Sequence, residues 1–163
     1  MHLDDLPVTT IDGRPTTLAE YAGTTKLIVN VASRCGFTPQ YEQLEALQRR
    51  YEARGFTVLG FPTDQFKQEL EDDEAVADYC STTWGVTFPM FARVAVNGND
   101  RSPLFTELVA APDESGEAGD VRWNFEKFLV TPSGEVSRFR SRTRPDDPAI
   151  VDRIEASVRP SAD

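Results

Sequence analysis

The stretch that decides the fold is residues 28–39, which read Ile28-Val29-Asn30-Val31-Ala32-Ser33-Arg34-Cys35-Gly36-Phe37-Thr38-Pro39. Its first half is apolar and β-branched, which is typical of a buried strand. Thr38 and Pro39 predict the N-cap and the first position of a following helix. Cys35 therefore lies where a strand passes into a helix, and the unpaired N–H groups of a helix N-terminus favour a thiolate. We expect nucleophilic thiol chemistry at Cys35, and the alternative is an inert buried cysteine.

Length and charge restrict the class of protein. The chain has 163 residues and a formal net charge of −10. This length is sufficient for one domain with its own core, so we expect a single domain over residues 1–163. The first residues lack a basic leader and no apolar run is long enough to span a bilayer, which predicts a cytoplasmic protein without stable membrane association. The acidic balance also disfavours nucleic acid as a partner.

The chain has two cysteines, Cys35 and Cys80. In a reducing compartment such a pair favours redox or catalytic use over a structural disulfide. The run Cys35-Gly36-Phe37-Thr38 differs from the Cys-x-x-Cys motif of disulfide exchangers, because Thr38 occupies the position of the second thiol. A partner sulfur for Cys35 must therefore come from another part of the chain.

Apolar runs, turn residues and capping residues alternate along the chain. They predict strands over 8–11, 16–18, 27–31, 56–61, 91–96, 125–130 and 135–139, and helices over 39–54, 72–82, 103–109 and 148–158. The strand–helix–strand unit around Cys35 predicts a parallel pair, and the late hairpin predicts antiparallel neighbours. The predicted class is α/β with a thioredoxin-like fold: a central mixed β-sheet flanked by helices, with an N-terminal β-hairpin.

Charged residues cluster in three places. Acidic residues are concentrated in 69–74 and 113–120, and neither run has the spacing of metal ligands, so we interpret both as solvated loops and expect no metal site. Arginines alternate at positions 138, 140, 142 and 144, so on a strand they would share one face. A solvated, edge-protecting face is the first interpretation, and a docking site for an acidic partner is the alternative.

Four motifs occur in a fixed order: Asn30-Val31-Ala32-Ser33-Arg34-Cys35-Gly36, Gly60-Phe61-Pro62-Thr63-Asp64-Gln65-Phe66, Gly85-Val86-Thr87-Phe88-Pro89 and Trp123-Asn124-Phe125-Glu126-Lys127-Phe128-Leu129. In this order the chain resembles the glutathione peroxidase family, in its cysteine-using, non-selenium branch, over about residues 8–158. The resemblance implies a thiol peroxidase that reduces hydrogen peroxide and organic or lipid hydroperoxides without a cofactor. It also implies a monomer, because no long insertion separates Asp100 from Trp123.

The resemblance implies four catalytic residues. Cys35 would be the peroxidatic cysteine that becomes a sulfenic acid, and Gln68, Trp123 and Asn124 would complete a polar tetrad around its sulfur. Their amide and indole N–H groups donate hydrogen bonds without carrying charge. The loop holding Gln68 is one residue shorter than the family's Phe-Gly-Gly-Gln-Glu-Pro pattern, so Gln65 is the alternative for that position.

Cys80 matches the resolving cysteine of thioredoxin-dependent members of the family. The sulfenic acid would condense with Cys80 to an intramolecular disulfide that thioredoxin reduces. A disulfide requires Cα atoms within about 7 Å, so the helix over 72–82 would have to unwind partly. Two alternatives remain open: a peroxidase recycled by glutathione, and a peroxide sensor that passes its disulfide to another protein.

Overall fold

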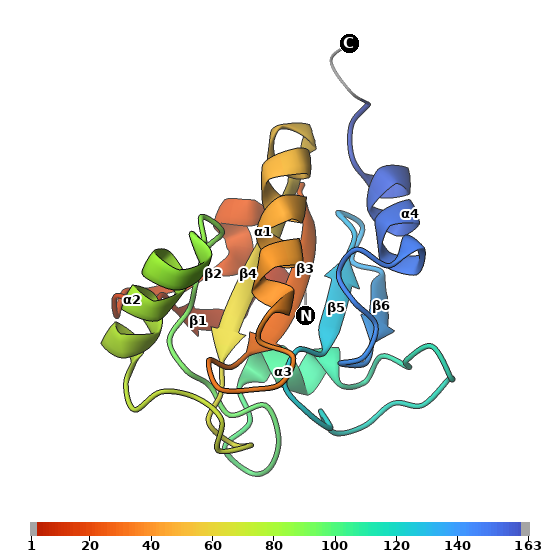
Figure 1. Cartoon of the computed structure of the whole chain (residues 1–163). Helices are drawn as coiled ribbons and strands as arrows, with labels where there is room; N and C mark the ends of the chain where they lie inside the picture. The colour runs from red at the N-terminus through yellow and green to blue at the C-terminus, as the bar shows by residue number, and fades with distance from the viewer. Residues whose placement is uncertain (1–2, 161–163) are drawn as a thin grey trace.

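The computed structural model describes residues 3–160. Its strands and α-helices are shown in Figure 1 and follow one another as β1 (Pro7–Thr9), β2 (Pro15–Thr17), β3 (Thr25–Val31), α1 (Gln40–Tyr51), β4 (Phe56–Pro62), α2 (Asp73–Trp84), α3 (Pro103–Leu108), β5 (Lys127–Val130), β6 (Val136–Phe139) and α4 (Pro148–Ser157). Short 3₁₀ helices span Leu3–Asp5, Leu18–Tyr21 and Glu52–Arg54.

The central sheet has four strands in the order β4-β3-β5-β6. β3 pairs in parallel with β4 and antiparallel with β5, and β5 pairs antiparallel with β6. β1 and β2 form a separate antiparallel hairpin. The prediction of a mixed sheet with an N-terminal hairpin is confirmed, and the crossover through α1 returns the chain beside β3 as a parallel pair requires.

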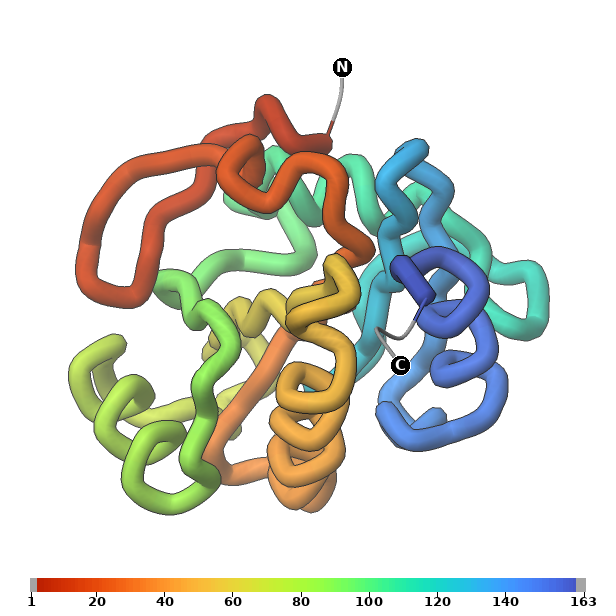
Figure 2. Tube along the Cα trace, turned by 90° about the horizontal axis from the view of Figure 1, so that it is seen from above, coloured from red at the N-terminus to blue at the C-terminus, as the bar shows by residue number. Residues whose placement is uncertain are grey.

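Two hydrophobic cores lie on the two faces of this sheet, because successive residues of a strand point to opposite faces. Leu27, Val29 and Val31 of β3 pack on one face with residues of α1, α2 and α4, whereas Ile28 belongs to the core with α3 and the N-terminal segment. Figures 1 and 2 show α1 and α4 on one side of the sheet and α3 on the other. The C-terminal end of β3 therefore lies between two sheet faces that are both covered by helices. This position fixes where the loop after β3 begins.

The helix after Cys35 begins later than the capping residues predict. Thr38 does not cap it: its Oγ1 accepts a hydrogen bond from the Cys35 N–H at 2.9 Å and donates one to the Ala32 carbonyl at 2.9 Å. α1 starts at Gln40, and Pro39 is the flanking residue without a side-chain cap. Thr38 instead closes the turn that holds Cys35.

The predicted strand over 91–96 is wrong. This segment makes isolated contacts with different neighbours: the Phe91 N–H donates to Gly60, the Ala92 N–H to Thr9, and the Val94 N–H to the Pro62 carbonyl. A bridge joins Gly60 to Met90, and a Cβ on Gly60 would lie 2.6 Å from the Met90 sulfur. The absence of a side chain at Gly60 therefore allows the segment to cross the edge of β4 closely, and no continuous ladder forms.

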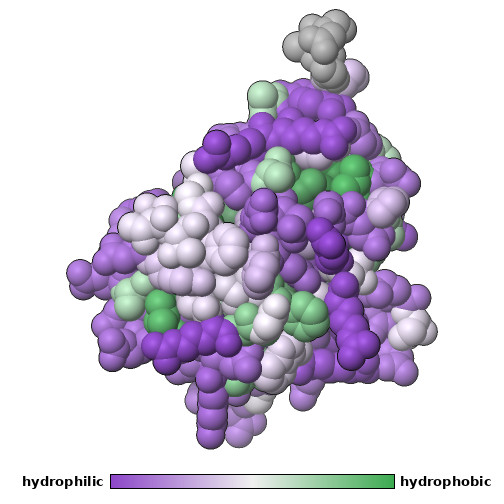
Figure 3. Space-filling view, in the orientation of Figure 1, coloured by the Kyte–Doolittle hydropathy of each residue, from purple (hydrophilic) through white to green (hydrophobic). Residues whose placement is uncertain are grey.

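The face of the molecule that carries α1 and α4 is largely hydrophilic, with small separate apolar patches (Figure 3). None of the described helices combines the length and apolar character needed to cross a membrane.

Candidate active site

Cys35 lies in a tight turn between β3 and α1, and its side chain is 7% exposed. The Phe37 N–H donates a hydrogen bond to the Cys35 Sγ at 3.4 Å, and the Thr38 N–H donates to the Cys35 carbonyl at 3.0 Å. A backbone N–H directed at sulfur stabilises negative charge there. The turn therefore directs one backbone N–H group at the Cys35 sulfur, ahead of the first turn of α1.

The loop between β4 and α2 is bound directly to the Cys35 turn. The Arg34 N–H donates to the Gln68 carbonyl at 2.8 Å, and the Ser33 N–H donates to Glu69 Oε1 at 3.0 Å. Lys67 adopts a left-handed conformation with φ of 59°, which is uncommon for a residue with a Cβ. The shortened loop thus still places Gln68 beside the two residues that precede Cys35.

A second segment, residues 122–126, is attached to β3 by Asn30. The Asn30 Nδ2 donates to the Trp123 carbonyl at 3.0 Å, its Oδ1 accepts from the Glu126 N–H at 3.1 Å, and its own carbonyl accepts from the Phe125 N–H. Phe125 has a positive φ of 65°. The chain therefore bends sharply just after Asn124. The hydrogen bonds of the buried Asn30 hold this segment in one conformation.

These two segments meet through the predicted site residues. The Asn124 side chain is fully buried, and its Nδ2 donates to Gln68 Oε1 at 3.4 Å. Trp123 is 36% exposed, and its ring lies against Phe66 with centroids 5.3 Å apart. Trp123 also lines a pocket of about 610 Å³ together with Phe37, which follows Cys35 by two residues. Gln68, Trp123 and Asn124 are thus gathered at the end of β3 that carries Cys35.

Gln65, the alternative to Gln68, is bound elsewhere. Its Oε1 accepts from the N–H groups of Val96 and Asn97 at 2.6 and 3.0 Å, and its Nε2 donates to the Asn97 carbonyl. All three bonds fasten the 96–97 turn, so the geometry favours Gln68 over Gln65.

Cys80 is 2% exposed and lies in α2, facing the core beneath that helix. Burial raises the pKa of the Cys80 thiol to about 11; the Tyr41 hydroxyl opposes this rise, and the negative charge of Glu69 adds to it. The Cys80 carbonyl accepts from the N–H groups of Gly85 and Val86 at the end of the helix. Both cysteines are unpaired in this structure.

Comparison with known proteins identifies the family. Residues 3–109 match the family model described as glutathione peroxidase. The chain is 48% identical to the thioredoxin/glutathione peroxidase BtuE of Escherichia coli over 91% of this chain and 92% of that one. It is also 48% identical to the hydroperoxy fatty acid reductase gpx1 of Synechocystis over 84% and 85%. The chain belongs to the glutathione peroxidase family.

Solved structures support both the family and the fold. A crystal structure titled Trgpx in apo form superposes with a TM-score of 0.76 at 34% identity, covering 98% of this chain and 99% of that one. A thioredoxin-family thiol:disulfide interchange protein from Chlorobium tepidum matches with a TM-score of 0.59 at 22% identity over 93% and 91%, which shows the fold alone. The resemblance to the glutathione peroxidases and the thioredoxin-like fold are both confirmed.

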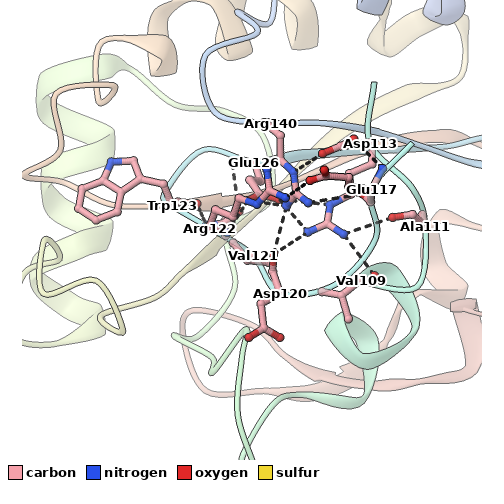
Figure 4. A network of polar contacts seen from close by, with 12 residues as sticks. Val109, Ala111, Asp113, Glu117, Asp120, Val121, Arg122, Trp123, Glu126 and Arg140 are labelled. Carbon is pink, nitrogen blue, oxygen red and sulfur yellow. Dashed lines mark hydrogen bonds and ion pairs between the residues drawn. The ribbon is translucent and has the colours of Figure 1, made fainter. Parts of the chain in front are cut away.

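In this glutathione peroxidase the arginine stripe divides in two: Arg142 and Arg144 are exposed, as the first interpretation expects, whereas Arg138 and Arg140 are not. Arg138 is completely buried against Glu126 at 3.0 Å, and its other N–H groups donate to the carbonyls of Val109, Ala111 and Asp120. Arg140 binds Glu126 at 2.8 Å and Asp113 at 2.7 Å. Figure 4 shows this network, with Trp123 directed away from it. The interpretation of both arginines as surface residues is wrong, because an acidic loop folds back over them.

The network fixes the segment that carries Trp123 and Asn124. Glu126 Oε2 accepts from the Arg122 N–H at 2.5 Å, so one buried carboxylate joins both ends of the 122–126 turn to β6. Asp113 belongs to an acidic run that the sequence suggested was solvated, yet its side chain is 2% exposed and bound to Arg140. Hydrogen bonds from Ser115 and Arg140 hold the pKa of Asp113 well below its usual range.

We expect Glu126→Ala to lower the free energy of unfolding by about 3–5 kcal/mol, because removing one partner leaves buried Arg138 without its counter-charge. Urea denaturation followed by circular dichroism measures this loss. Glu117→Ala is the matched control, since Glu117 pairs with Arg122 at the surface, where an ion pair contributes less than about 1 kcal/mol. Equal losses in the two variants would contradict a structural role for the buried network.

Glu69 is the site residue that sequence reasoning missed. We assigned it to a solvated acidic run, but it is 9% exposed and bound to the Cys35 turn. Only its position next to Gln68 in the family pattern distinguished it from its acidic neighbours. Among residues 3–160 no group of three His, Cys, Asp or Glu side chains forms a cluster that could hold a metal ion.

Proposed function

We propose that this chain is a thiol peroxidase that reduces hydroperoxides at Cys35 and is recycled by thioredoxin through a disulfide with Cys80. The Cys35 thiolate attacks the terminal peroxide oxygen, the O–O bond breaks, and the departing oxygen leaves as water or an alcohol after taking a proton. Cys35 becomes a sulfenic acid. The observation that supports this proposal is that Gln68, Trp123 and Asn124 lie at the same end of β3 as the turn in which the Phe37 N–H binds the Cys35 sulfur.

We propose that Gln68, Trp123 and Asn124 act as uncharged donors in the first step. Negative charge moves from the Cys35 sulfur to the leaving oxygen, and fixed N–H groups stabilise such charge without reorganising. The Asn124 Nδ2 and the Gln68 amide are already in contact, and the positive φ of Phe125 and of Lys67 holds each segment in place. Phe37 and Trp123 give the pocket that they line an apolar part, which suits the organic chain of a lipid hydroperoxide, and Arg122 and Arg142 line it as well.

The resolving role proposed for Cys80 requires motion. Cys80 lies within the second half of α2, with its carbonyl bound at the helix C-terminus, whereas Cys35 lies in the turn after β3. A disulfide needs both Cα atoms within about 7 Å and a defined dihedral angle. We propose that α2 opens after Cys35 is oxidised, which brings Cys80 to the sulfenic acid.

Consumption of peroxide with two reductant systems tests the proposal. Hydrogen peroxide and a fatty acid hydroperoxide are each supplied with thioredoxin, thioredoxin reductase and NADPH, or with glutathione, glutathione reductase and NADPH. We expect sustained NADPH oxidation with thioredoxin and at least about tenfold less with glutathione, because an internal resolving thiol makes glutathione unnecessary. Faster turnover with glutathione would instead support a peroxidase that is recycled by glutathione. Stoichiometric oxidation without turnover in either system would support a sensor.

We expect Trp123→Phe and Asn124→Ala each to slow oxidation of Cys35 by about tenfold to a thousandfold, because each removes one N–H donor. Stopped-flow measurement of the first reaction with peroxide gives the rate. Gln65→Ala is the control, since its amide is bound to the 96–97 turn. If both variants are folded and oxidise as fast as the wild type, the two side chains have packing and turn roles only.

We also propose a cytoplasmic monomer. Two unpaired cysteines are typical of a reducing compartment, and recycling by thioredoxin requires such a compartment. Cell fractionation and size-exclusion chromatography at micromolar concentration test the two statements separately.

A further inference from the structure

Glu69 is a buried carboxylate, and of its two oxygens only Oε1 accepts hydrogen bonds from the described residues. It follows Gln68 in the loop between β4 and α2, and its Oε1 accepts from the Ser33 N–H at 3.0 Å and the Leu70 N–H at 2.8 Å. These bonds attach the carboxylate to the loop of Cys35. Its Oε2 is buried and has no hydrogen-bond partner in the part of the chain that the structure describes. An unpaired buried oxygen is costly, at about 1–3 kcal/mol, so its presence calls for a functional explanation.

The groups around Glu69 come from both elements that cover it. The negative charge of Glu69 raises the pKa of Tyr41 of α1 and of Cys80 of α2, and the Ser33 side chain lowers the pKa of Glu69. The Tyr41 hydroxyl and the Ser33 Oγ are also buried without a hydrogen-bond partner among residues 3–160. Arg93 is the cation that acts on Glu69, and Tyr79 is a further titratable group that acts on Tyr41. Burial raises the pKa of Glu69, with Ser33, Leu70 and Arg93 opposing the rise.

The resolving reaction needs an acceptor for the Cys80 proton. With a pKa of about 11, only about one Cys80 in ten thousand is a thiolate at neutral pH. The thiolate is the form that attacks a sulfenic acid. Glu69 is bound to the Ser33 N–H, two residues before Cys35, so it stays beside the sulfenic acid that Cys80 reaches when α2 opens, and a carboxylate there can accept the thiol proton.

We propose that Glu69 is the proton acceptor for Cys80 in the resolving step, an inference that rests on the proposed function. The Cys80 S–H bond breaks and its proton passes to Glu69 Oε2, directly or through the Tyr41 hydroxyl. The Cys80 sulfur then bonds to the Cys35 sulfur, the S–O bond of the sulfenic acid breaks, and the hydroxide takes the proton from Glu69 to leave as water. The carboxylate is regenerated, and no other oxidant or reductant is consumed.

The other carboxylates of the same loop are less suited to this step. Asp72 caps α2 by accepting from the Ala75 N–H, and Asp73 accepts from the Arg93 N–H. Glu71 is exposed. Glu69 is the member of this acidic run that is bound to the residues preceding Cys35, and its negative charge acts on Cys80.

Glu69→Gln tests the proposal, because the amide oxygen can still accept from the N–H groups of Ser33 and Leu70 but the amide cannot take a proton. The reduced full-length protein is mixed with hydrogen peroxide, quenched with acid at intervals, and analysed by mass for reduced, sulfenic and disulfide forms. At neutral pH we expect disulfide formation to slow by about a hundredfold. Oxidation of Cys35 should slow far less than disulfide formation, because the first step needs no proton acceptor for Cys80.

The matched control is Glu71→Gln, the same change at an exposed neighbour, which should leave both rates unchanged. Disulfide formation at the wild-type rate in Glu69→Gln would overturn the proposal. Equal slowing of both steps would also overturn it, because it would show that Glu69 only positions the Cys35 loop. The proposed function fails separately, if Cys80→Ser still turns over with thioredoxin.

The pH dependence distinguishes proton transfer from packing. In the wild type the rate of disulfide formation should level off above the pKa of Glu69, whereas in Glu69→Gln it should keep rising with pH as the Cys80 thiol ionises. The two rates should therefore converge in alkaline solution. If circular dichroism shows that Glu69→Gln is not folded, the pH dependence of the wild type alone tests the proposal. A rate of disulfide formation that rises steadily through neutral pH without a plateau would overturn it.

Discussion

Cys35→Ser is expected to abolish peroxide reduction, with a loss of at least about a thousandfold in the rate of peroxide consumption. A serine hydroxyl at this position is not ionised near neutral pH, and it cannot form the sulfenic acid that the cycle requires. The Phe37 N–H would still meet an oxygen in place of the sulfur, so the turn and the fold should persist. The measurement is NADPH-coupled turnover with thioredoxin, together with stopped-flow mixing of the variant and hydrogen peroxide.

Alkylation separates loss of the nucleophile from loss of the fold. Iodoacetamide near neutral pH should label Cys35 in the wild type faster than Cys80, because burial raises the Cys80 pKa to about 11. Circular dichroism should show Cys35→Ser as folded as the wild type. Substantial peroxide turnover in the folded variant would place the chemistry at another residue.

The sequence predicted the sheet and most of its helices because local patterns encode them. Alternating residues such as Val29 and Val31 face one core, and Asp147 caps α4 as its position before Pro148 suggests. The segment over 91–96 was missed because its hydrogen bonds go to Gly60, Thr9 and the end of β4 in turn. Such contacts depend on which segments the fold brings together, and apolar content alone does not reveal them.

The burial of charged residues was harder to predict from the sequence than the strands and helices were. The alternation of Arg138 and Arg140 correctly indicates a shared face, since both reach Glu126. Whether that face meets water or carboxylates depends on the path of residues 109–122, which no local pattern specifies. Glu69 is a similar case: it has the same side chain as Glu71, and only the two N–H groups that bind it turn it inward.

Motif order predicts the residues of the proposed site, but it does not predict how they pack. The sequence motifs indicate Gln68 and Asn124, but the contact between them depends on the left-handed conformations of Lys67 and Phe125. Neither residue is a glycine, so the sequence gives no sign of a positive φ. The structure also reveals why the loop can be one residue shorter than the family pattern, because backbone bonds from Ser33 and Arg34 hold it in place.

The proposed opening of α2 concerns the interface between that helix and α1. Trp84 lies against Tyr41 with ring centroids 6.2 Å apart, and the Trp84 Nε1 and the Tyr41 hydroxyl are both buried without hydrogen-bond partners in the described residues. Opening the helix would hydrate these groups and so offset part of the cost of exposing apolar surface. The disulfide would then add about 4 kcal/mol by restricting the unfolded chain, before strain is subtracted.

Cys80→Ser is expected to keep one rapid reaction with peroxide per chain and to lose turnover driven by thioredoxin. The first step needs only Cys35, whereas recycling needs a second sulfur to form the disulfide that thioredoxin attacks. Rapid-quench mass analysis should show a sulfenic acid that persists in Cys80→Ser and a disulfide in the wild type. Thr82→Ser serves as the control, because it changes the same helix without removing a thiol and keeps the hydroxyl that bonds to the Asp78 carbonyl. Undiminished thioredoxin turnover in Cys80→Ser would refute the resolving role.

Hydrogen exchange then tests the motion that this role requires. In the oxidised wild type the amides of α2 should exchange faster than in the reduced protein, because the disulfide forms only if helical hydrogen bonds around Cys80 break. β3 should stay protected in both forms, since it is paired with β4 on one side and β5 on the other. Oxidised Cys80→Ser has no disulfide and should keep the protection of the reduced protein. If α2 were equally protected in both forms of the wild type, with the disulfide confirmed by mass, the two cysteines would have to meet without unwinding, and the opening of α2 would be wrong.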